Sequence, residues 1–260
     1  MNPLDRFRLD GRRALITGST MGIGLGIAEA FAGAGAQGVL LNSEAGGEAS
    51  ETALARVRAA GPQSEAGYLC QDLSLPAAGT TLARAVVEAT GGYGVDILVL
   101  NAGVQVEKPW MEITPAEFQL QISVNLQSGL ELLQGLVPLM EQRQFGRVII
   151  ISSVQASKPA GQMLVYAGTK AALNNQARNL ARQLGPHGIT VNTISPGIFN
   201  TPRNATFMAN AAEQEQAKKW VPVRRVGEPE DCAGIAILLA SEAGSYMNGA
   251  DYRVDGGTGA

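Results

Sequence analysis

Short, continuously apolar segments alternate along the chain with longer segments of helical spacing. The apolar segments are ALIT at 14–17, VLLN at 39–42, DILVLN at 96–101, RVIIIS at 147–152 and ITVNTI at 189–194. Because they lack polar alternation, they suit strands that are buried on both faces. The segment after Lys170 carries leucine and alanine at helical intervals, at Leu173, Ala177, Leu180 and Leu184. This alternation predicts an α/β fold, in which right-handed βαβ units form one doubly wound parallel sheet with helices on both faces.

The chain has 260 residues, which is long enough to bury a large core, and nothing in it suggests a second domain. We find no linker, internal repeat or low-complexity tract, so we predict a single domain over residues 1–260. The longest interruption of the pattern runs from Ile198 to Pro222 and contains the polar stretch EQEQAKKW. We expect a surface helix or a substrate lid at about 198–222.

Composition and charge exclude several classes of function. The formal net charge of -3 provides no basic field for nucleic acid or anionic lipid. No apolar run approaches the roughly 20 residues that span a bilayer, and the N-terminal MNPLDRFRLDGRR lacks the apolar core of a signal peptide. Cys70 and Cys232 lie far apart without metal-ligand spacing, and His187 is the only histidine. We therefore expect a cytoplasmic protein with two buried, reduced thiols and no metal, membrane or nucleic-acid partner.

A glycine-rich turn leads from the first apolar segment directly into a helical one. The sequence is ALITGSTMGIGLGIAEAF, with Gly18, Gly22 and Gly24 in a TGxxxGxG spacing rather than the common GxGxxG. Glycines allow a tight turn and a close approach of the backbone to a pyrophosphate, and a helix N-terminus supplies free N–H groups. A glycine cluster alone marks a turn as often as a site, but its place between strand and helix favours dinucleotide binding.

Tyr166 and Lys170 in the stretch VYAGTK stand four residues apart, so a helix would place them on one face. A free tyrosine is a poor base at neutral pH, because its phenol ordinarily ionises near pH ~10. A neighbouring ammonium favours the phenolate and makes the pair suitable for moving a hydroxyl proton. Taken alone, this pattern is common by chance and favours the simpler interpretation of a half-buried aromatic ring and a solvated charge.

Six motifs together resemble the short-chain dehydrogenase/reductase family. They are TGSTMGIG, LNAG at 100–103, Asn125 in SVNL, Ser153 in IISS, YAGTK and SPGIFNT, and the resemblance extends to VDGG at 254–257. Their order agrees with the family along essentially the whole chain, as does the spacing of thirteen residues from Ser153 to Tyr166. The resemblance implies a single Rossmann-like domain with seven parallel strands. It also implies NAD(P)-dependent transfer of a hydride between the cofactor and an alcohol or carbonyl substrate.

The resemblance implies a role for each of four catalytic residues. Tyr166 would act as the acid or base, and Lys170 would also hold the hydroxyls of the nicotinamide ribose. Ser153 would donate to the substrate oxygen as negative charge develops there. Asn125 would hold a water that links Lys170 to solvent as a proton relay.

The family pattern also implies a set of cofactor contacts. Asp72 either caps a helix or contacts the adenine, and Thr201 with the Ile198 backbone would meet the nicotinamide carboxamide. Pro196 and Gly197 would lie where the chain leaves a strand and turns toward the cofactor. The implied contacts are Gly18, Thr20, Met21, Gly22, Ile23, Gly24, Asn42, Ser43, Asp72, Leu73, Asn101, Ala102, Gly103, Tyr166, Lys170, Pro196, Gly197, Ile198 and Thr201.

The choice between NAD and NADP depends on the end of the second strand. An acidic residue there selects NAD and a basic residue accommodates the extra phosphate of NADP. Asn42 is neutral, and Met21 and Ser43 stand where a basic residue is expected. Glu44 would disfavour a phosphate if it faces the ribose. The sequence therefore favours NAD, with use of both cofactors as the alternative.

The expected substrate pocket is polar. We expect substrate contacts from Ser153, Tyr166, Gln155 and Asn200, and amides at such positions suit a substrate with several hydroxyls. The sequence therefore favours a sugar, a polyol or an aldonate. Three cations of the expected lid either meet a substrate carboxylate or are simply solvated: Arg203, Lys218 and Lys219.

Two other functions remain as alternatives. The whole sequence also resembles a 3-oxoacyl-carrier-protein reductase, although Gln144 and His187 stand where basic residues for an acidic carrier are expected. A nucleotide-binding regulator without catalysis is the third possibility, but such proteins usually lose the tyrosine or lysine that Tyr166 and Lys170 supply here. The resemblance further implies a homotetramer, with interfaces on the helices of Asn125 and Tyr166 and on the C-terminal segment.

Overall fold

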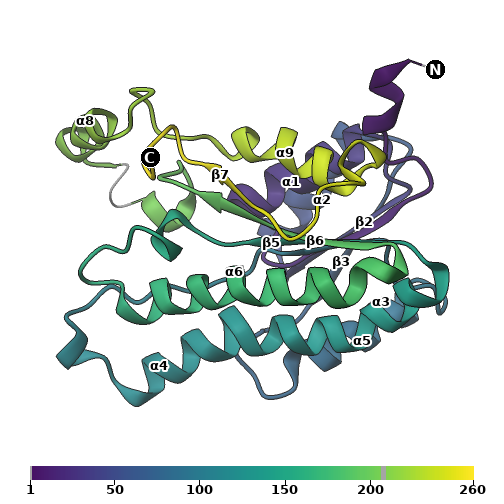
Figure 1. Ribbon diagram of the computed structural model, residues 1–260, viewed down its shortest axis with the longest axis horizontal. Helices are drawn as coiled ribbons and strands as arrows, with labels where there is room; N and C mark the ends of the chain where they lie inside the picture. The colour runs from purple at the N-terminus through teal and green to yellow at the C-terminus, as the bar shows by residue number, and fades with distance from the viewer. Residues whose placement is uncertain (1, 206–208) are drawn as a thin grey trace.

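Seven strands form one parallel sheet in the order β3-β2-β1-β4-β5-β6-β7. The structure is a computed structural model that describes residues 2–205 and 209–260 (Figure 1). The strands are β1 Arg13–Ile16, β2 Gly38–Ser43, β3 Glu65–Cys70, β4 Ile97–Leu100, β5 Gly146–Ile151, β6 Ile189–Pro196 and β7 Asp251–Val254.

Helices cover both faces of the sheet (Figure 1). One apolar core packs α1, α2 and α9 against the sheet, and a second core packs α3, α5 and α6 against the opposite face. The predicted doubly wound α/β sheet is confirmed. The described helices are α1 Gly22–Gly33, α2 Glu48–Ala60, α3 Ala78–Ala89, α4 Pro115–Ile122, α5 Ser128–Arg143, α6 Leu164–Leu184, α8 Ala211–Trp220 and α9 Ala233–Ala240.

The five apolar segments all become strands, displaced by no more than two residues at either end. No continuous apolar segment predicts β3 or β7, because these two strands form the edges of the sheet and are only partly buried. Strand β3 contains Glu65 and Gly67, and β7 contains Asp251 and Arg253, so neither has a continuous apolar run. Half-exposed edge strands therefore lack the continuous apolar pattern that predicts buried strands.

The direction of winding changes between β1 and β4, which are neighbours in the sheet although two strands separate them in the chain. A parallel sheet opens a crevice at such a point, outside the carboxyl ends of its strands. The glycine turn follows β1, and the LNAG motif forms the end of β4 and the loop after it. The topology therefore brings these two motifs to the same crevice.

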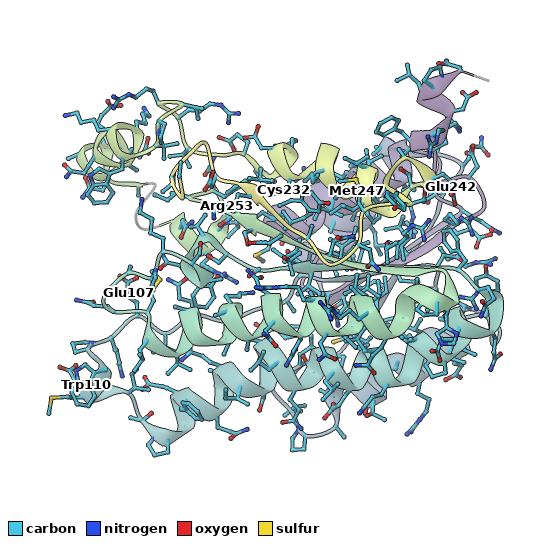
Figure 2. All side chains as sticks on the ribbon, in the orientation of Figure 1. Glu107, Trp110, Cys232, Glu242, Met247 and Arg253 are labelled. Atoms are coloured by element: carbon cyan, nitrogen blue, oxygen red, sulfur yellow. The ribbon has the colours of Figure 1, made fainter. Side chains whose placement is uncertain are left out.

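The two cysteines lie in different environments. Cys232 is fully buried at the N-terminus of α9, and burial raises the pKa of its thiol to about 12 (Figure 2). Cys70 is exposed at the end of the edge strand β3, where its Sγ lies 3.5 Å from the Glu44 carbonyl oxygen. The expectation of two buried thiols was therefore wrong for Cys70, because β3 leaves its last residue at the rim of the sheet.

Gln144 and His187 precede β5 and β6, so they lie at the amino edge of the sheet, opposite the glycine turn. Arg143 beside them is already engaged, since its guanidinium donates to the carbonyl oxygens of Tyr93 and Val95 at 2.6 and 2.7 Å. Within one chain these positions cannot line an entrance at the carboxyl edge. None of the helices in the described parts of the chain has the length and apolar character needed to cross a bilayer.

Packing of α3 on α5 predicts a sensitive glycine. A Cβ on Gly79 would overlap the carbonyl oxygen of Ser128, at the start of α5. Gly79→Ala should therefore lower the free energy of unfolding by about 2 kcal/mol, although alanine is the better helix former. Gly234→Ala in α9 is the matched control, because no described atom lies within 4 Å of its added Cβ. Chemical denaturation measures both variants, and equal stabilisation of the two would contradict this account of the packing.

Candidate active site

The glycine turn presents the N-terminus of α1 to the crevice. Gly18 and Gly22 have φ of 59° and 56°, a left-handed conformation that glycine adopts without strain. No described side chain caps α1, and the first amide of the helix to bond a preceding carbonyl is that of Leu25, to Met21 at 3.3 Å. The earlier N–H groups and the helix dipole are therefore available to an anion, which fits a dinucleotide pyrophosphate.

Asn101 and Thr17 join the glycine turn to the loop after β4. The Asn101 amide donates to the carbonyl oxygens of Thr17 and Gly18, both at 2.8 Å. The Thr17 hydroxyl accepts the backbone N–H groups of Asn101 and Ala102, both at 3.0 Å. A Cβ at Gly24 would lie 2.5 Å from Asn101 Nδ2, so a side chain there would displace this amide. The two loops therefore form one rigid wall of the crevice.

The segment after β6 meets the glycine turn from the other side. A Cβ on Gly22 would lie 3.3 Å from the methyl carbon of Thr201, so the glycine turn and the segment after β6 are nearly in contact. Pro196 is the last residue of β6 and pairs with β7, so the strand ends two residues later than expected. The chain leaves the sheet at Gly197, which is partly buried like Ile198.

Asn42 does not face the position expected for the ribose. Its side chain is buried and donates to the carbonyl oxygens of Leu69 and Gln71 at 3.1 and 3.2 Å, which ties β2 to β3. The Ser43 hydroxyl lies 3.0 Å from both the Ala45 carbonyl oxygen and the Tyr68 hydroxyl. At the carboxyl end of β2, the residues nearest to solvent are therefore the exposed Glu44 and the partly buried Ser43.

Asp72 caps a turn rather than a helix. Its Oδ1 accepts the backbone N–H of Ser74 at 2.8 Å, and α3 begins only at Ala78. The expected helix cap was therefore wrong, while an adenine contact by Asp72 stays a prediction. Leu73 beside it is buried in the core.

Asn125 lies in a single turn of π-helix, Ser123–Gln127, between α4 and α5. Its Oδ1 accepts the N–H of Val104 at 2.8 Å, and its Nδ2 donates to the Val104 carbonyl and the Thr169 hydroxyl, both at 3.0 Å. The wider turn displaces the buried amide from regular helical register and holds it against α6. Thr169 stands one residue before Lys170, so Asn125 is anchored beside that lysine.

Lys170 is almost fully buried, and its Nζ donates to the Ile151 carbonyl oxygen at 2.8 Å. The ammonium lies 5.6 Å from the centre of the Tyr166 ring, which is also buried. Burial lowers the pKa of Lys170 to about 7, with a smaller contribution from the nearby charge of Arg203. A lysine in this environment can gain and lose a proton near neutral pH.

Ser153 and Ser152 follow β5 and have different surroundings. The Ser152 hydroxyl donates to the Lys170 carbonyl at 3.2 Å, whereas the Ser153 hydroxyl accepts the N–H of Gln155 at 3.1 Å. The amide oxygen of Gln155 accepts the N–H of Ala160 at 2.6 Å. Ser153 therefore retains its hydroxyl proton for a ligand, and Gln155 has no described partner for its amide N–H groups.

The segment 198–222 includes the surface helix α8, as expected for its polar sequence, while residues 206–208 lie outside the described part. Asn200 donates from its amide to the Glu228 carboxylate at 3.1 and 3.3 Å. Lys218 pairs with Glu215 at 2.6 Å. Arg203 instead reaches across the crevice, where its Nη2 donates to the Gly103 carbonyl oxygen at 2.5 Å.

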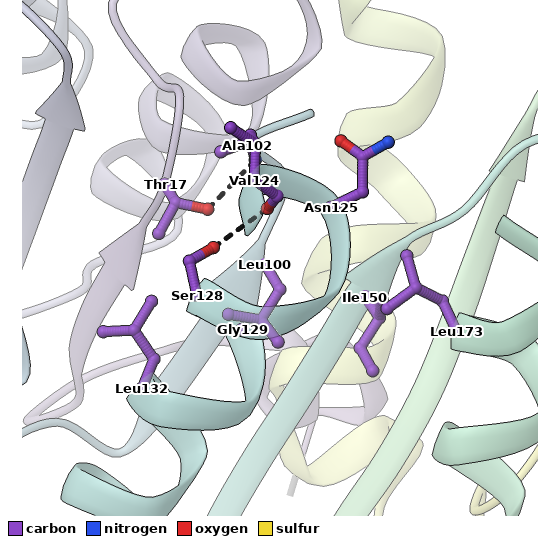
Figure 3. Close-up of a pocket in the computed structure, with 10 residues that line it drawn as sticks. All are labelled: Thr17, Leu100, Ala102, Val124, Asn125, Ser128, Gly129, Leu132, Ile150 and Leu173. Carbon is purple, nitrogen blue, oxygen red and sulfur yellow. Dashed lines mark hydrogen bonds between the residues drawn. The ribbon is translucent and has the colours of Figure 1, made fainter. Parts of the chain in front are cut away.

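A small cavity of about 10 Å³ lies beside Asn125, behind the loop after β4 (Figure 3). Its polar lining comes from Thr17, Asn125 and Ser128, and apolar side chains such as Leu132 close the rest. The volume matches about one water-sized sphere and excludes any sugar or acyl chain. This cavity is therefore not the substrate site.

Three further side chains hold site residues in place by hydrogen bonds but were not among the expected site residues, namely Thr17, Ser19 and Thr169. Ser19 Oγ donates to the Ile16 carbonyl at 2.7 Å and accepts the Asn42 N–H at 3.1 Å. Thr17 and Ser19 belong to TGSTMGIG and Thr169 to YAGTK, so both motifs already contained them. Nothing in spacing distinguishes such bracing residues, because their partners come from distant parts of the chain.

The burial of Lys170 predicts a pH-dependent stability. Because its pKa falls from 10.5 to about 7 on folding, charging it opposes the folded state fully below pH 7. That penalty, on the order of a few kcal/mol, disappears as the pH rises from 7 toward 10.5. Lys170→Met should therefore raise the melting temperature of the cofactor-free protein near pH 6.5, with the advantage shrinking or reversing near pH 10.

The matched control for this measurement is Lys219→Met, since Lys219 is exposed on α8 and its ammonium forms no hydrogen bond or ion pair with a described residue at the distances that define them. Its melting temperature should follow that of the unmodified protein at both pH values. A difference between Lys170→Met and the unmodified protein that stays constant from pH 6.5 to pH 10 would contradict the burial effect.

Comparison with known proteins identifies the family. A family model described as enoyl-(acyl carrier protein) reductase matches residues 18–259. The chain is 34% identical over 254 residues to human dehydrogenase/reductase SDR family member 4, covering 96% of this chain and 88% of that protein.

Two solved structures with NADP bound are also similar. A 3-oxoacyl (acyl-carrier-protein) reductase from Agrobacterium tumefaciens C58 has a TM-score of 0.92 and 38% identity, covering 99% of this chain and 98% of that chain. A gluconate 5-dehydrogenase from Burkholderia cenocepacia J2315, in complex with NADP and tartrate, has a TM-score of 0.89 and 35% identity, covering 98% of both chains. Together with the crevice described above, these similarities show that the chain is an NAD(P)-dependent oxidoreductase that belongs to the short-chain dehydrogenase/reductase family.

Proposed function

We propose that this enzyme transfers a hydride between NAD(P) and a polyhydroxy substrate, namely a sugar, a polyol or an aldonate. The observation that carries the substrate class is Gln155, two residues after Ser153. Its amide oxygen is bound to Ala160 N while its N–H groups have no described partner. These free donors suit substrate hydroxyls, and the similarity to a gluconate 5-dehydrogenase supports the same class. We include Asn200 as a second substrate contact, since its Oδ1 accepts no described hydrogen bond.

Four side chains perform the proton chemistry in this proposal. In the oxidative direction, Tyr166 Oη accepts the proton of the substrate hydroxyl, and Ser153 Oγ donates to the same oxygen. Lys170 holds the phenolate by its charge and exchanges its own proton near neutral pH. Asn125 stands beside Lys170 and holds the water through which that proton reaches solvent. The cofactor, when bound, supplies the hydride acceptor.

The cofactor residues divide between three parts of the crevice. Gly18, Thr20, Met21, Gly22, Ile23 and Gly24 hold the pyrophosphate at the start of α1. Asn42, Ser43, Asp72, Leu73, Asn101, Ala102 and Gly103 shape the adenosine side, with Asn42 acting through the backbone because its amide is bound to β3. Pro196, Gly197, Ile198 and Thr201 meet the nicotinamide, while Tyr166 and Lys170 hold its ribose.

We propose a single-domain, cytoplasmic homotetramer with a lid at about 198–222. Exposed apolar side chains on α4, α5 and α6 support the interfaces, namely Phe118, Leu120, Leu130 and Leu164. The polar helix α8 supports the lid. Light scattering of the purified protein measures the assembly.

A 3-oxoacyl-carrier-protein reductase is the second candidate. Its support is the similarity to a reductase of that kind at 38% identity. The absence of arginine at Gln144 and His187 counts less than expected against it, because both residues lie at the amino edge of the sheet. Turnover of a 3-oxoacyl thioester above that of every sugar and aldonate would favour this candidate.

The proton role of Tyr166 predicts a selective loss of turnover. Tyr166→Phe removes the hydroxyl and keeps the ring, so kcat should fall by about 10³-fold while the cofactor Kd changes less than about threefold. Reduced-cofactor fluorescence measures binding, and absorbance of the reduced nicotinamide measures turnover. Tyr246→Phe is the control, since Tyr246 is fully exposed, and it should leave both unchanged. Retained turnover in Tyr166→Phe would remove the proposed base.

We propose NAD as the preferred cofactor, with NADP also accepted, because the rim near the ribose offers the exposed Glu44 and no basic residue from Asn42 to Gly47. Ser43→Arg should then raise kcat/KM with NADP relative to NAD by about 10-fold, since a guanidinium pairs with a phosphate. Ser43→Gln introduces a longer side chain without a charge and should leave the ratio of kcat/KM with NADP to that with NAD near its original value. A marked preference of the unmodified enzyme for NADP would overturn the proposal.

A further inference from the structure

Arg203 is an exposed cation that points into the crevice without a carboxylate partner. It lies on the 3-10 turn Pro202–Asn204, and its only hydrogen bond in the described parts of the chain is to the Gly103 carbonyl oxygen at 2.5 Å. By contrast, Arg56 and Arg225 each bind a carboxylate through two nitrogens, those of Glu29 and Asp231. A neutral carbonyl is the weaker acceptor for a guanidinium. Arg203 is therefore held in place but not neutralised.

The guanidinium lies beside the proposed catalytic residues. A Cβ built on Gly103 would be 4.0 Å from Arg203 Nη2 and 3.4 Å from both Lys170 Nζ and Asn125 Oδ1. The charge of Arg203 is close enough to contribute to the lowered pKa of Lys170. Two cationic groups thus converge on one side of Gly103, and no acidic side chain of the described residues pairs with either of them.

The other two cations of the 198–222 segment are placed differently. Lys218 forms an ion pair with Glu215 on the same helix. Lys219 is exposed on α8 and has no described partner in the crevice. Of the three cations that the sequence offered for a substrate carboxylate, Arg203 alone reaches the crevice next to Lys170.

We propose that Arg203 is a specificity-determining residue that binds a carboxylate of the substrate and so selects acidic sugars over neutral ones. The proposal rests on the proposed function, because the carboxylate belongs to the substrate that Tyr166 deprotonates. A guanidinium offers a planar pair of donors that matches the two oxygens of a carboxylate. On binding, Arg203 exchanges the Gly103 carbonyl for this stronger acceptor. The carboxylate is not changed in the reaction, so the residue orients substrate and transfers no proton.

The test compares D-gluconate with D-gluconamide, which keeps the hydroxyls and replaces the carboxylate by a neutral amide. In Arg203→Gln, kcat/KM for gluconate should fall by about 10- to 100-fold, while the value for gluconamide and the KM of the cofactor stay within about threefold. Arg203→Lys should recover part of the loss, since it restores charge without the planar fork. Lys219→Gln is the matched control and should leave kcat/KM unchanged for both substrates.

Three results would overturn the proposal: an equal loss for acid and amide, a loss confined to the KM of the cofactor, or turnover of neutral alcohols only. If no sugar, polyol or aldonate reacts at all, the proposed substrate class is wrong. Arg203 is then judged by calorimetry of tartrate with the protein and NADP. Tartrate binding that weakens about 10-fold or more in Arg203→Gln supports the carboxylate site. Equal binding to both proteins, or no binding to the unmodified protein, overturns it.

Discussion

The hydrogen bonds that join the ends of β1 and β4 are the constraint on which the site depends. The Asn101 side chain and the Thr17 hydroxyl together make four contacts across the point where the direction of winding changes. Buried polar groups of this kind are stable only when each has a partner, so the two loops keep one relative position. The glycine turn and the loop that carries Gly103 are thereby joined to each other.

Burial of Lys170 is the second constraint, and it is costly. A fully buried ammonium loses its hydration, and the Ile151 carbonyl restores only part of it. In the proposed mechanism this burial is useful, because a lysine whose pKa lies near 7 is present in both protonation states near neutral pH. The π-helical turn at Asn125 brings an amide beside Lys170 at the expense of regular helix.

Much of the fold was predictable from the sequence because buried parallel strands have an unambiguous pattern. The edge strands β3 and β7 had no such pattern, and Cys70 at the end of β3 was wrongly expected to be buried. The motif residues came from spacing and resemblance, and the structure brings Gly18, Gly22, Asn101, Asn125 and Lys170 to one crevice. The direction of the Asn42 side chain and the cap made by Asp72 were not predictable, because both depend on backbone groups supplied by other segments.

The sequence by itself determined the sheet class, the glycine turn and the identities of the proposed reacting groups, because each is encoded in local periodicity or in a short motif. Only the tertiary structure decided which of the three cations of the 198–222 segment reaches the crevice and how deeply Lys170 is buried. It also decided that Gln144 and His187 lie at the edge away from the site. These properties arise from contacts between residues far apart in the chain, such as Arg203 with Gly103. The local sequence pattern cannot predict these contacts, since Arg203 in the same sequence could equally be solvated.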